Sequence, residues 1–387
     1  MLLNIFIKKI LFIFITLLSG LSISYAEIQK KYTISQYSYE NRRTDFQHFS
    51  RIDLPLKELG FDARNGRFRI QDARAIFKYP DGSIGFVQHT LVNGPWNTPK
   101  IKDAIPGKIL LFKKINGIWK NNDSIIDKSN NVPGCIHPRK IIAADFNKDG
   151  IIDFVIACQG WDAKPYPGER SRILLSQPEG TYKFQYMSDH IDFQHGATSG
   201  DINGDGYPDL IVTALKGAHV FINNHKGFFI KSNTYKLPQI KKAFHVELID
   251  INNDGLVDLI VGSHSWQDSA KIILNPGDNN FGKSSKQIII PEIPGAGTIV
   301  DFLYIKPTNT LYILRTGDGK SNGTKFYHGM WLQKFNLTNK KSNVVYENKN
   351  YKNETRRAWH TWIIEKNGFI MSDYDDSIVV PINQSKP

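Results

Sequence analysis

The chain has 387 residues, a formal net charge of +12 at pH 7 and only two cysteines. Its length suits a large repeat fold better than one ordinary domain. The basic residues are scattered and form no long Lys/Arg block, so we do not expect nucleic acid as a partner. Two thiols are also too few for a cysteine-based zinc site.

The first 26 residues have the features of a secretory signal peptide. Lys8 and Lys9 precede an apolar run from Ile10 to Leu18, and Ala26 ends a small-residue cleavage site. We expect cleavage after Ala26 and a secreted or periplasmic mature protein, with an uncleaved anchor as the alternative. The apolar run is too short to span a bilayer comfortably and no comparable run follows it, so no transmembrane span is expected after cleavage.

Short β-hairpins recur along the mature chain, which runs from residue 27 to residue 387. Residues 49–54 alternate well enough to form a strand, and a first hairpin covers residues 75–87. Three well-formed hairpins then begin at Asp145, Asp201 and Asp250, and two weaker ones follow at residues 298–314 and 362–371.

Each well-formed unit also contains a second hairpin, as at residues 172–184, where Glu179-Gly180 supplies the turn. Four short strands repeated roughly every 50 residues are typical of a β-propeller blade. The sequence therefore predicts an all-β fold, a single β-propeller domain of six to seven four-stranded blades, with the best-formed blades within residues 137–290. We expect the strand near residues 47–54 to close the ring against the last blade.

Cys135 and Cys158 flank one of these hairpins and could pair in an oxidising compartment. A closed loop of about two dozen residues would contribute roughly 3 kcal/mol on a chain-entropy model. We predict this disulfide, with two unpaired thiols as the alternative.

The three well-formed hairpins share the motif D-x-N-x-D-G-x-x-D, at residues 145–153, 201–209 and 250–258. Alternating oxygen-bearing side chains followed by a glycine suit a short loop that wraps a hard cation. A helical EF-hand would need an acid at position twelve, but that position holds Ile156, Val212 and Val261. Three such loops in register favour bound cations over plain Asx-Gly turns.

These hairpins resemble those of the FG-GAP/VCBS repeat propellers, the group that includes integrin-α-like propellers. The segment 158–168, continuing through residues 172–176, is similar to bacterial exported members. The resemblance is strong over residues 137–290 and faint on either side. It implies a secreted or cell-envelope propeller whose blades carry calcium. It implies no single activity, because such propellers serve as adhesins, lectin-like modules and occasionally enzymes.

In a propeller of this kind each loop would hold one structural Ca²⁺, about three in all, through four side chains and one backbone carbonyl. Oxygen-only donors favour Ca²⁺ over Zn²⁺, and over Mg²⁺ less decisively. The expected ligand sets are Asp145, Asn147, Asp149, Ile151 and Asp153; Asp201, Asn203, Asp205, Tyr207 and Asp209; and Asp250, Asn252, Asp254, Leu256 and Asp258.

A second surface should lie at the opposite end of the hairpins, where the second strands return. Besides His89, that end should collect the candidate catalytic residues His137, Arg139, His195 and His245 and the candidate ligand-binding residues Trp96, Trp161, Asp162, His264, Trp266, Trp359 and His360. Three interpretations stay open: a glycan-binding face, a catalytic face that pairs a histidine base with Arg139, or side chains that only pack the blades and fill the channel.

We expect a monomeric, calcium-stabilised binding or adhesion module, with an anionic polysaccharide, a cell-surface glycan or a protein as the partner. The alternative is a propeller-type polysaccharide lyase or hydrolase that uses the His/Arg/Trp-lined face. Whether the protein is an enzyme is left open by the sequence, which contains no P-loop, HExxH motif or nucleophile elbow.

Overall fold

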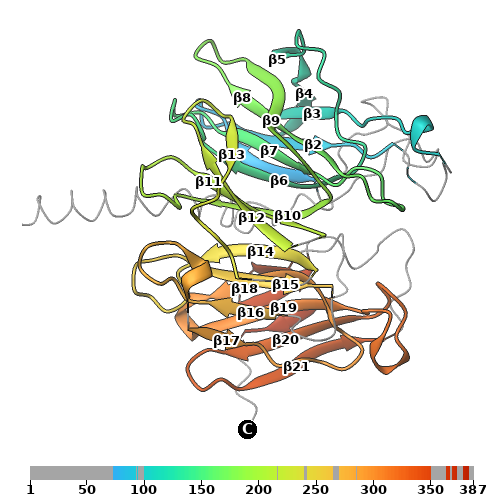
Figure 1. The fold of residues 1–387 in the computed structure, drawn as a ribbon, viewed down its shortest axis with the longest axis vertical. Helices are drawn as coiled ribbons and strands as arrows, with labels where there is room; N and C mark the ends of the chain where they lie inside the picture. The colour runs from blue at the N-terminus through green and yellow to red at the C-terminus, as the bar shows by residue number, and fades with distance from the viewer. Residues whose placement is uncertain are drawn as a thin grey trace, which may run out of the picture.

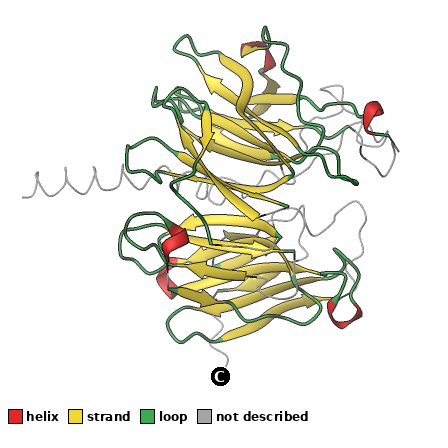
Figure 2. Ribbon diagram, in the orientation of Figure 1, coloured by secondary structure: helices red, strands yellow, loops and turns green. Residues whose placement is uncertain are grey.

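The computed structural model describes residues 73–92, 94, 100–215, 217–238, 242–264, 270–284, 286–349, 363–366, 368–372 and 378–382. Within these residues the fold is built from short antiparallel sheets stacked one after another (Figures 1 and 2). No helix in the described part of the chain is long and apolar enough to cross a membrane. The predicted strand at residues 49–54, and its proposed ring-closing contact, lie outside the described residues.

Five sheets have four or more strands, and each follows chain order from its first strand to its last, except for one added edge strand. Blade 1 contains β1 (Arg74–Lys78), β2 (Ile84–His89), β3 (Ile109–Ile115) and β4 (Ile118–Asn121). Blade 2 contains β6 (Pro138–Ala144), β7 (Asp153–Cys158), β8 (Glu169–Ser176) and β9 (Tyr182–Asp192). Blade 3 contains β10 (Gln194–Gly200), β11 (Asp209–Ala214), β12 (Gly217–Asn223) and β13 (Phe229–Lys231).

Blade 4 contains β14 (Ala243–Ile249), β15 (Asp258–Ser263), β16 (Ala270–Ile273) and β17 (Gln287–Ile289). Blade 5 contains β18 (Thr298–Ile305), β19 (Thr310–Thr316), β20 (Met330–Asn336) and β21 (Ser342–Asn348). A last sheet has three described strands, β22 (Ile363–Lys366), β23 (Phe369–Ser372) and β24 (Val379–Pro381). Short 3-10 turns cover Ile101–Asp103, Asp123–Ile125, Phe281–Lys283, Lys306–Thr308 and Ser321–Gly323.

The prediction of an all-β propeller is confirmed, but the predicted blade number is wrong for the described residues. They form five four-stranded blades rather than six to seven. The hairpin predicted at residues 362–371 does form, as β22 and β23, yet only one further strand joins it. The weak repeats at the two ends of the chain therefore carried too little signal for counting blades.

Blade 2 has one strand that the hairpin pattern did not predict. The segment β5 (Ile126–Asp127) leaves blade 1 and pairs in parallel with β9, so that Ile126 lies opposite Tyr182. Every other described strand pair is antiparallel. The linker between blades 1 and 2 consequently covers part of the outer edge of blade 2.

The first strand of each sheet lies innermost, beside the first strands of its neighbours in the stack. In blades 2 to 4 the first and second strands are buried along almost their whole length, whereas outer strands such as β4 bury only one residue in four. Aromatic side chains fill the space between blades, as where Phe146 meets Phe229 edge-on at 5.3 Å. This packing fixes the two ends of the inner strands, where the candidate sites lie.

Candidate functional site

The three D-x-N-x-D-G-x-x-D loops join β6 to β7, β10 to β11 and β14 to β15, at one end of the inner strands. We call this end the cation-loop face. In the first loop both carboxylate oxygens of Asp145 accept backbone N–H groups, from Asp149 at 3.1 Å and from Gly150 at 2.9 Å. Gly150 has φ +87°, in the region that favours glycine, which explains the glycine of the motif.

The ninth motif position is the most deeply buried part of each loop. Asp153 accepts N–H groups from Phe146 at 2.7 Å and from Ser176 at 2.6 Å, so its carboxylate ties the loop to β8. Asp209 and Asp258 repeat the arrangement with Asn223 and Asn275. Burial raises the pKa of Asp153 and Asp209 to about 7 and that of Asp258 to about 6, even though the hydrogen bonds favour the ionised form.

The loops offer a donor set that fits calcium: carboxylate and amide oxygens without nitrogen or sulfur donors. An ionised carboxylate has about four acceptor sites, so the hydrogen bonds leave lone pairs available. In the third loop, Oδ1 of Asp250 is buried and accepts no hydrogen bond, which leaves an oxygen for an ion. The three acids of each loop do not all lie within 4.8 Å of one another, so a bound ion would draw them closer.

Blade 1 shows what the hairpin becomes once the ligands are lost. Phe77 and Tyr79 replace the first and third ligands and are buried. The remaining acid, Asp81, accepts hydrogen bonds from Ser83 and lies 2.6 Å from the Lys113 ammonium. These hydrogen bonds, from Lys113 first, lower the pKa of Asp81. A lysine thus supplies here the positive charge that a cation could supply in the other blades.

The opposite end of the inner strands carries many of the histidines, and we call it the histidine face. Of the predicted residues there, Trp96, Trp266, Trp359 and His360 lie outside the described residues. The structure brings together His137, Arg139, His195 and His264, and it places Asp162 beside Arg139. Burial raises the pKa of the Asp162 carboxyl, and the charge of Arg139 opposes this shift. Trp161 is only 4 % exposed, so its ring is packed inside and does not form an open platform.

A β-bulge lies near the start of each inner strand of blades 2 to 5. The pairing shifts register at Arg139, at His195 and Gly196, at Phe244 and at Val300. A bulge re-aims the side chain at its position and interrupts the alternation of the two sheet faces. Arg139, His195 and Phe244 are therefore positioned by the same irregularity in three successive blades.

A row of aromatic and imidazole rings crosses the histidine face. Neighbouring ring centres are 5.1–5.4 Å apart along the order Tyr166, Phe193, His195, His264 and Phe326. The two outer rings are the exposed ones, Tyr166 at 38 % and Phe326 at 42 %. The row thus has a buried ring at Phe193, half-buried rings at His195 and His264, and two exposed ends.

Beside the middle of this row, the Phe244 ring contacts His264 with ring centres 3.9 Å apart and planes tilted by 35°, and the Arg139 guanidinium lies 5.1 Å from the Phe244 ring centre. The Tyr327 hydroxyl lies 3.0 Å from Nε2 of His264. Phe244, Phe326 and Tyr327 were missed by sequence reasoning because no motif surrounds them. The aromatic pair at residues 326–327 was the only signal that the sequence offered.

His195 and His264 are neutral at pH 7. Burial, followed by the nearby charges of Arg139 and Lys242, lowers the pKa of His264 to about 3. Burial also lowers the pKa of His195 well below its usual value, and His264, Arg139 and His137 add to the effect. The positive charge therefore resides on Arg139 and the lysines, while the imidazoles serve as neutral hydrogen-bonding groups.

Lys242 and Lys320 bring two exposed ammonium groups together at the edge of the histidine face. The backbone carbonyl of Lys242 accepts the N–H of His264 at 3.1 Å, which ties this lysine to the ring row. Partial desolvation, followed by repulsion from Lys320, lowers the pKa of Lys242. Two like charges held together favour a bound anion between them.

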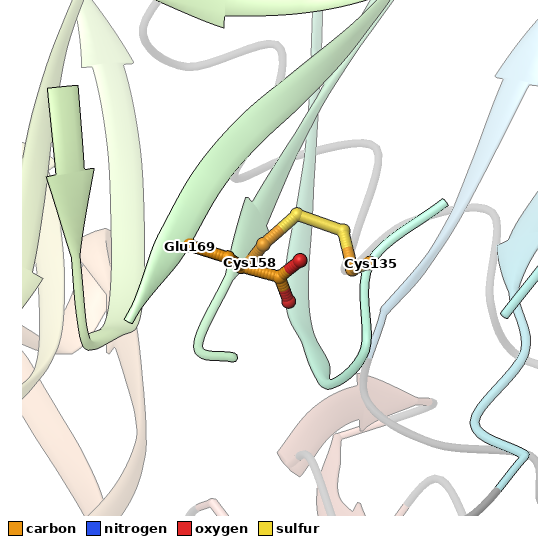
Figure 3. Close-up of side chains that lie close together, drawn as sticks. All are labelled: Cys135, Cys158 and Glu169. Carbon is orange, nitrogen blue, oxygen red and sulfur yellow. A yellow bond between two sulfur atoms is a disulfide. The ribbon is translucent and has the colours of Figure 1, made fainter. Parts of the chain in front are cut away.

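Cys135 and Cys158 form a disulfide that fixes the segment leading into β6. Glu169 lies beside it, as Figure 3 shows. Metal coordination by these three residues is excluded because both sulfurs are used in the covalent bond. The cluster instead has a structural function at the base of the histidine face.

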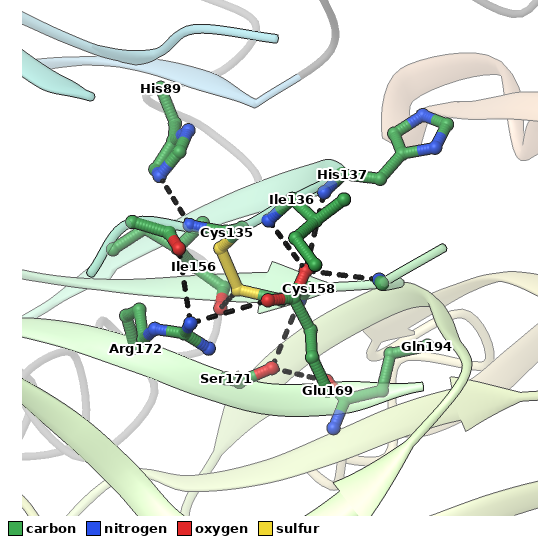
Figure 4. Close-up of a disulfide and its surroundings, with 12 residues drawn as sticks. His89, Cys135, Ile136, His137, Ile156, Cys158, Glu169, Ser171, Arg172 and Gln194 are labelled. Atoms are coloured by element: carbon green, nitrogen blue, oxygen red, sulfur yellow. Dashed lines mark hydrogen bonds and ion pairs between the residues drawn. A yellow bond between two sulfur atoms is a disulfide. The ribbon is translucent and has the colours of Figure 1, made fainter. Parts of the chain in front are cut away.

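Glu169 anchors this segment by accepting backbone N–H groups from Ile136 at 2.9 Å, His137 at 3.2 Å and Gly160 at 3.0 Å (Figure 4). Arg172 donates to Glu169 at 3.2 Å and to the carbonyl of Pro133 at 2.9 Å. Burial raises the pKa of Glu169, whereas Arg172 and the three N–H groups lower it.

On the other side of the disulfide, His89 holds the same segment. Its Nε2 accepts the Cys135 N–H at 2.9 Å, so its Nδ1 donates to the carbonyl of Thr90 at 2.9 Å. Burial lowers the pKa of His89 to about 4. His89 is therefore a neutral structural histidine. In Figure 4 the His137 ring points away from this cluster.

His245 belongs to a different cluster, inside the stack of inner strands. Its Nε2 lies 3.1 Å from Glu247 and 3.4 Å from Asp301, and the Lys140 ammonium pairs with Glu247 at 3.2 Å. Burial, followed by Lys140, lowers the pKa of His245 to about 4, against the opposing effect of the two carboxylates. The structure does not bring His245 to the rings of the histidine face, which separates it from the other three catalytic candidates.

The comparisons with known proteins agree with the repeat pattern. A model of the FG-GAP-like repeat matches residues 145–212 and 201–261. No curated protein matches the chain significantly.

Among solved structures, one similar chain is a putative 6-phosphogluconolactonase from Bacteroides fragilis, with a TM-score of 0.46, 9% identity and coverage of 80% of this chain and 82% of that one. Another is Sqt1 from Saccharomyces cerevisiae, with a TM-score of 0.43, 10% identity and coverage of 77% and 68%. A third is an Agrocybe aegerita lectin that recognises non-reducing terminal N-acetylglucosamine, with a TM-score of 0.39, 14% identity and coverage of 76% and 84%.

The repeat match falls on the blades that carry the motif loops, and the sheets around it follow propeller order. The chain therefore contains FG-GAP-like repeats, at residues 145–212 and 201–261, and these repeats lie within a β-propeller.

Proposed function

We propose that this propeller is an exported, calcium-stabilised binding module whose histidine face recognises an acidic polysaccharide. The observation that carries this proposal is the row of rings with exposed ends, Tyr166 and Phe326, bordered by Arg139, Lys242 and Lys320. Sugar recognition commonly combines an apolar ring face with convergent polar groups, and both are present here.

The exposed rings would provide the stacking surfaces. Phe326 contacts His264 edge-on and also packs against Tyr327 with ring centres 4.2 Å apart, so its orientation is held by two neighbours. Tyr166 packs against one neighbouring ring, that of Phe193. Two supported rings at opposite ends of the row suit an extended chain of sugars better than a single small ligand.

The charges select an anionic chain. Arg139 and Lys242 are close enough to His264 to lower its pKa, and Lys320 is next to Lys242. Asp162 is the acid near Arg139 and partly offsets its charge. The lysine pair has greater freedom to bind a carboxylate or sulfate group. The net charge of +12 would favour the encounter with an anionic polymer.

Calcium would support this surface from a distance, through residues 145–153, 201–209 and 250–258 at the other end of the same strands. The buried carboxylates of Asp153, Asp209 and Asp258 join each loop to its blade. An ion that neutralises these loops would thereby stabilise the inner strands that present Arg139, His195 and Phe244.

Calorimetric titration of the calcium-loaded protein with polygalacturonate and with a neutral galactan would test the proposal. We expect binding to polygalacturonate that weakens with added salt, and no measurable binding to galactan. Phe326→Ala should weaken binding about tenfold, which corresponds to about 1.4 kcal/mol. Phe369→Ala is the matched control, because Phe369 is exposed to a similar degree, 41 %, on the β22–β23 hairpin.

A second pair of variants tests whether binding depends on the positive charge of the lysine pair. The double variant Lys242→Gln/Lys320→Gln should weaken binding and reduce its salt dependence. Lys340→Gln/Lys341→Gln removes the same charge from the exposed β20–β21 hairpin and should leave binding unchanged. Equal affinity for polygalacturonate and galactan, or equal losses in the two double variants, would reject the proposed site.

A lyase is the second candidate, favoured by one contact. His264 is neutral and its Nε2 lies 3.0 Å from the Tyr327 hydroxyl, with Arg139 nearby to neutralise a sugar carboxylate. A neutral imidazole could accept a proton and a phenol could donate one. Accumulation of unsaturated products in the polygalacturonate mixture, abolished by Tyr327→Phe, would establish this activity in place of simple binding.

A further inference from the structure

We propose that His190, Asp192 and His219 form a binding site for a divalent transition-metal ion, with Zn²⁺ as its characteristic metal. Nε2 of His190 lies 3.4 Å from Oδ2 of Asp192, and Nε2 of His219 lies 3.1 Å from the same oxygen. All three potential ligand atoms lie within 4.8 Å of one another. No repeat motif includes these residues.

The spacing matches a zinc coordination sphere. Donors at about 2.0–2.2 Å from Zn²⁺ in a tetrahedron are about 3.3–3.6 Å apart. The two measured separations lie at or just below that range, so small side-chain rotations would place the three atoms around one ion. Two imidazoles and one carboxylate favour a borderline metal over Ca²⁺, which prefers oxygen donors only.

Neighbouring groups hold the three side chains in place. His190 and Asp192 lie near the end of β9, where the pairing with β8 is irregular, and their side chains meet at Oδ2 of Asp192. Oδ1 of Asp192 accepts the Phe193 N–H at 2.8 Å, which leaves Oδ2 toward the imidazoles. The His190 ring packs against Phe221 with ring centres 5.5 Å apart. Such support is typical of metal ligands.

The site connects two blades. β9 is the last strand of blade 2 in chain order, whereas His219 comes from β12, the third strand of blade 3. The three side chains are 17–27 % exposed, so an ion could enter from solvent and retain an open position for water. A bound metal would therefore cross-link neighbouring blades at the surface.

One charged neighbour opposes the metal. The Lys231 ammonium is 3.5 Å from Nε2 of His219, the same atom that faces Asp192. A single imidazole nitrogen cannot donate to Asp192 and accept from Lys231 at once. Lys231 is exposed and can turn away, and its removal should strengthen metal binding.

The test is a titration of the full-length, calcium-loaded protein with Zn²⁺ in competition with a chromophoric chelator. We expect one saturable zinc equivalent. His190→Gln and His219→Gln should each weaken that binding at least tenfold, and Lys231→Gln should strengthen it. His225→Gln is the matched control, because His225 also has an Asp contact, Asp205 at 2.7 Å, but lacks a second imidazole.

Replacing Zn²⁺ by Co²⁺ tests independently which residues bind the metal. Visible absorption bands of a four-coordinate Co²⁺ centre should appear in the unmodified protein and in His225→Gln, and should be lost in Asp192→Asn. The proposal is overturned if no saturable zinc equivalent is found, or if His225→Gln loses as much affinity as His219→Gln. Folding of each variant is checked by its thermal unfolding midpoint without zinc.

Discussion

The two ends of the inner strands of blades 2 to 4 are built in different ways. The cation-loop face comes from contiguous nine-residue motifs, in which each loop hydrogen-bonds mainly to itself and its own blade. The histidine face is assembled from side chains of several blades, such as Arg139, His195 and Phe326. The first end can therefore be recognised from a short stretch of sequence, whereas the second exists only after the blades have been placed side by side.

The largest expected effect is a loss of stability at the cation-loop face. Chelation of calcium should lower the stability by about 8 kcal/mol for three independent sites at a free calcium concentration one hundred times Kd. Thermal unfolding with and without chelator, followed by back-titration with Ca²⁺, measures this loss. Asp250→Asn should reduce the calcium stoichiometry by one, and Asp81→Asn, in the hairpin paired with Lys113, should not change it. If chelation leaves the unfolding midpoint unchanged, calcium does not stabilise this face.

An intermediate effect is expected at the base of the histidine face. Glu169→Ala removes the acceptor of three backbone N–H groups and leaves the Arg172 charge buried without its carboxylate. Breaking a buried ion pair typically costs about 3–5 kcal/mol, which urea unfolding can measure. Glu179→Ala, at an exposed turn, is the control and should change stability by less than about 0.5 kcal/mol. Similar losses in the two variants would show that the Glu169 cluster does not hold the segment before β6.

The smallest expected effect is a dependence of stability on pH. Because burial lowers the pKa of His89 to about 4, the unfolded chain binds more protons than the folded protein between about pH 6.5 and pH 4. The contribution of His89 to stability should thus be fully present above the unfolded pKa and be lost as the pH falls through this window, by at most about 3.4 kcal/mol. His89→Gln should reduce the decline measured by urea unfolding without abolishing it, because His195, His245 and His264 also have lowered pKa values, and His225→Gln, on the cation-loop face, should keep the full decline. A decline that is identical in both variants would assign it to other groups.

Sequence reasoning predicted the parts of the fold that local chemistry determines. The motif of Asp201–Asp209 predicted a turn followed by a strand, and β11 indeed begins at Asp209. The hairpin rule also predicted that His137, His195 and His264 share one end. It could not predict that Trp161 is buried, since burial depends on neighbouring segments far away in the chain.

The bulges explain the remaining errors at the candidate site. The sequence does not show the register shift at Phe244, next to His245, and these two consecutive residues lie in different clusters. His245 therefore joins Glu247 and Asp301, while Phe244 supports the ring row. The blade number was wrong because the hairpins outside residues 137–290 retain turns but not the cation ligands, so the repeat could not be counted reliably.

The short strand β5 has a consequence for the protein in solution. An uncovered outer strand presents unpaired backbone groups that can recruit strands from other molecules. By pairing Ile126 and Asp127 with β9, the linker between blades 1 and 2 caps part of that edge with the chain's own backbone. At high protein concentration, β5 would therefore reduce edge-to-edge aggregation through blade 2.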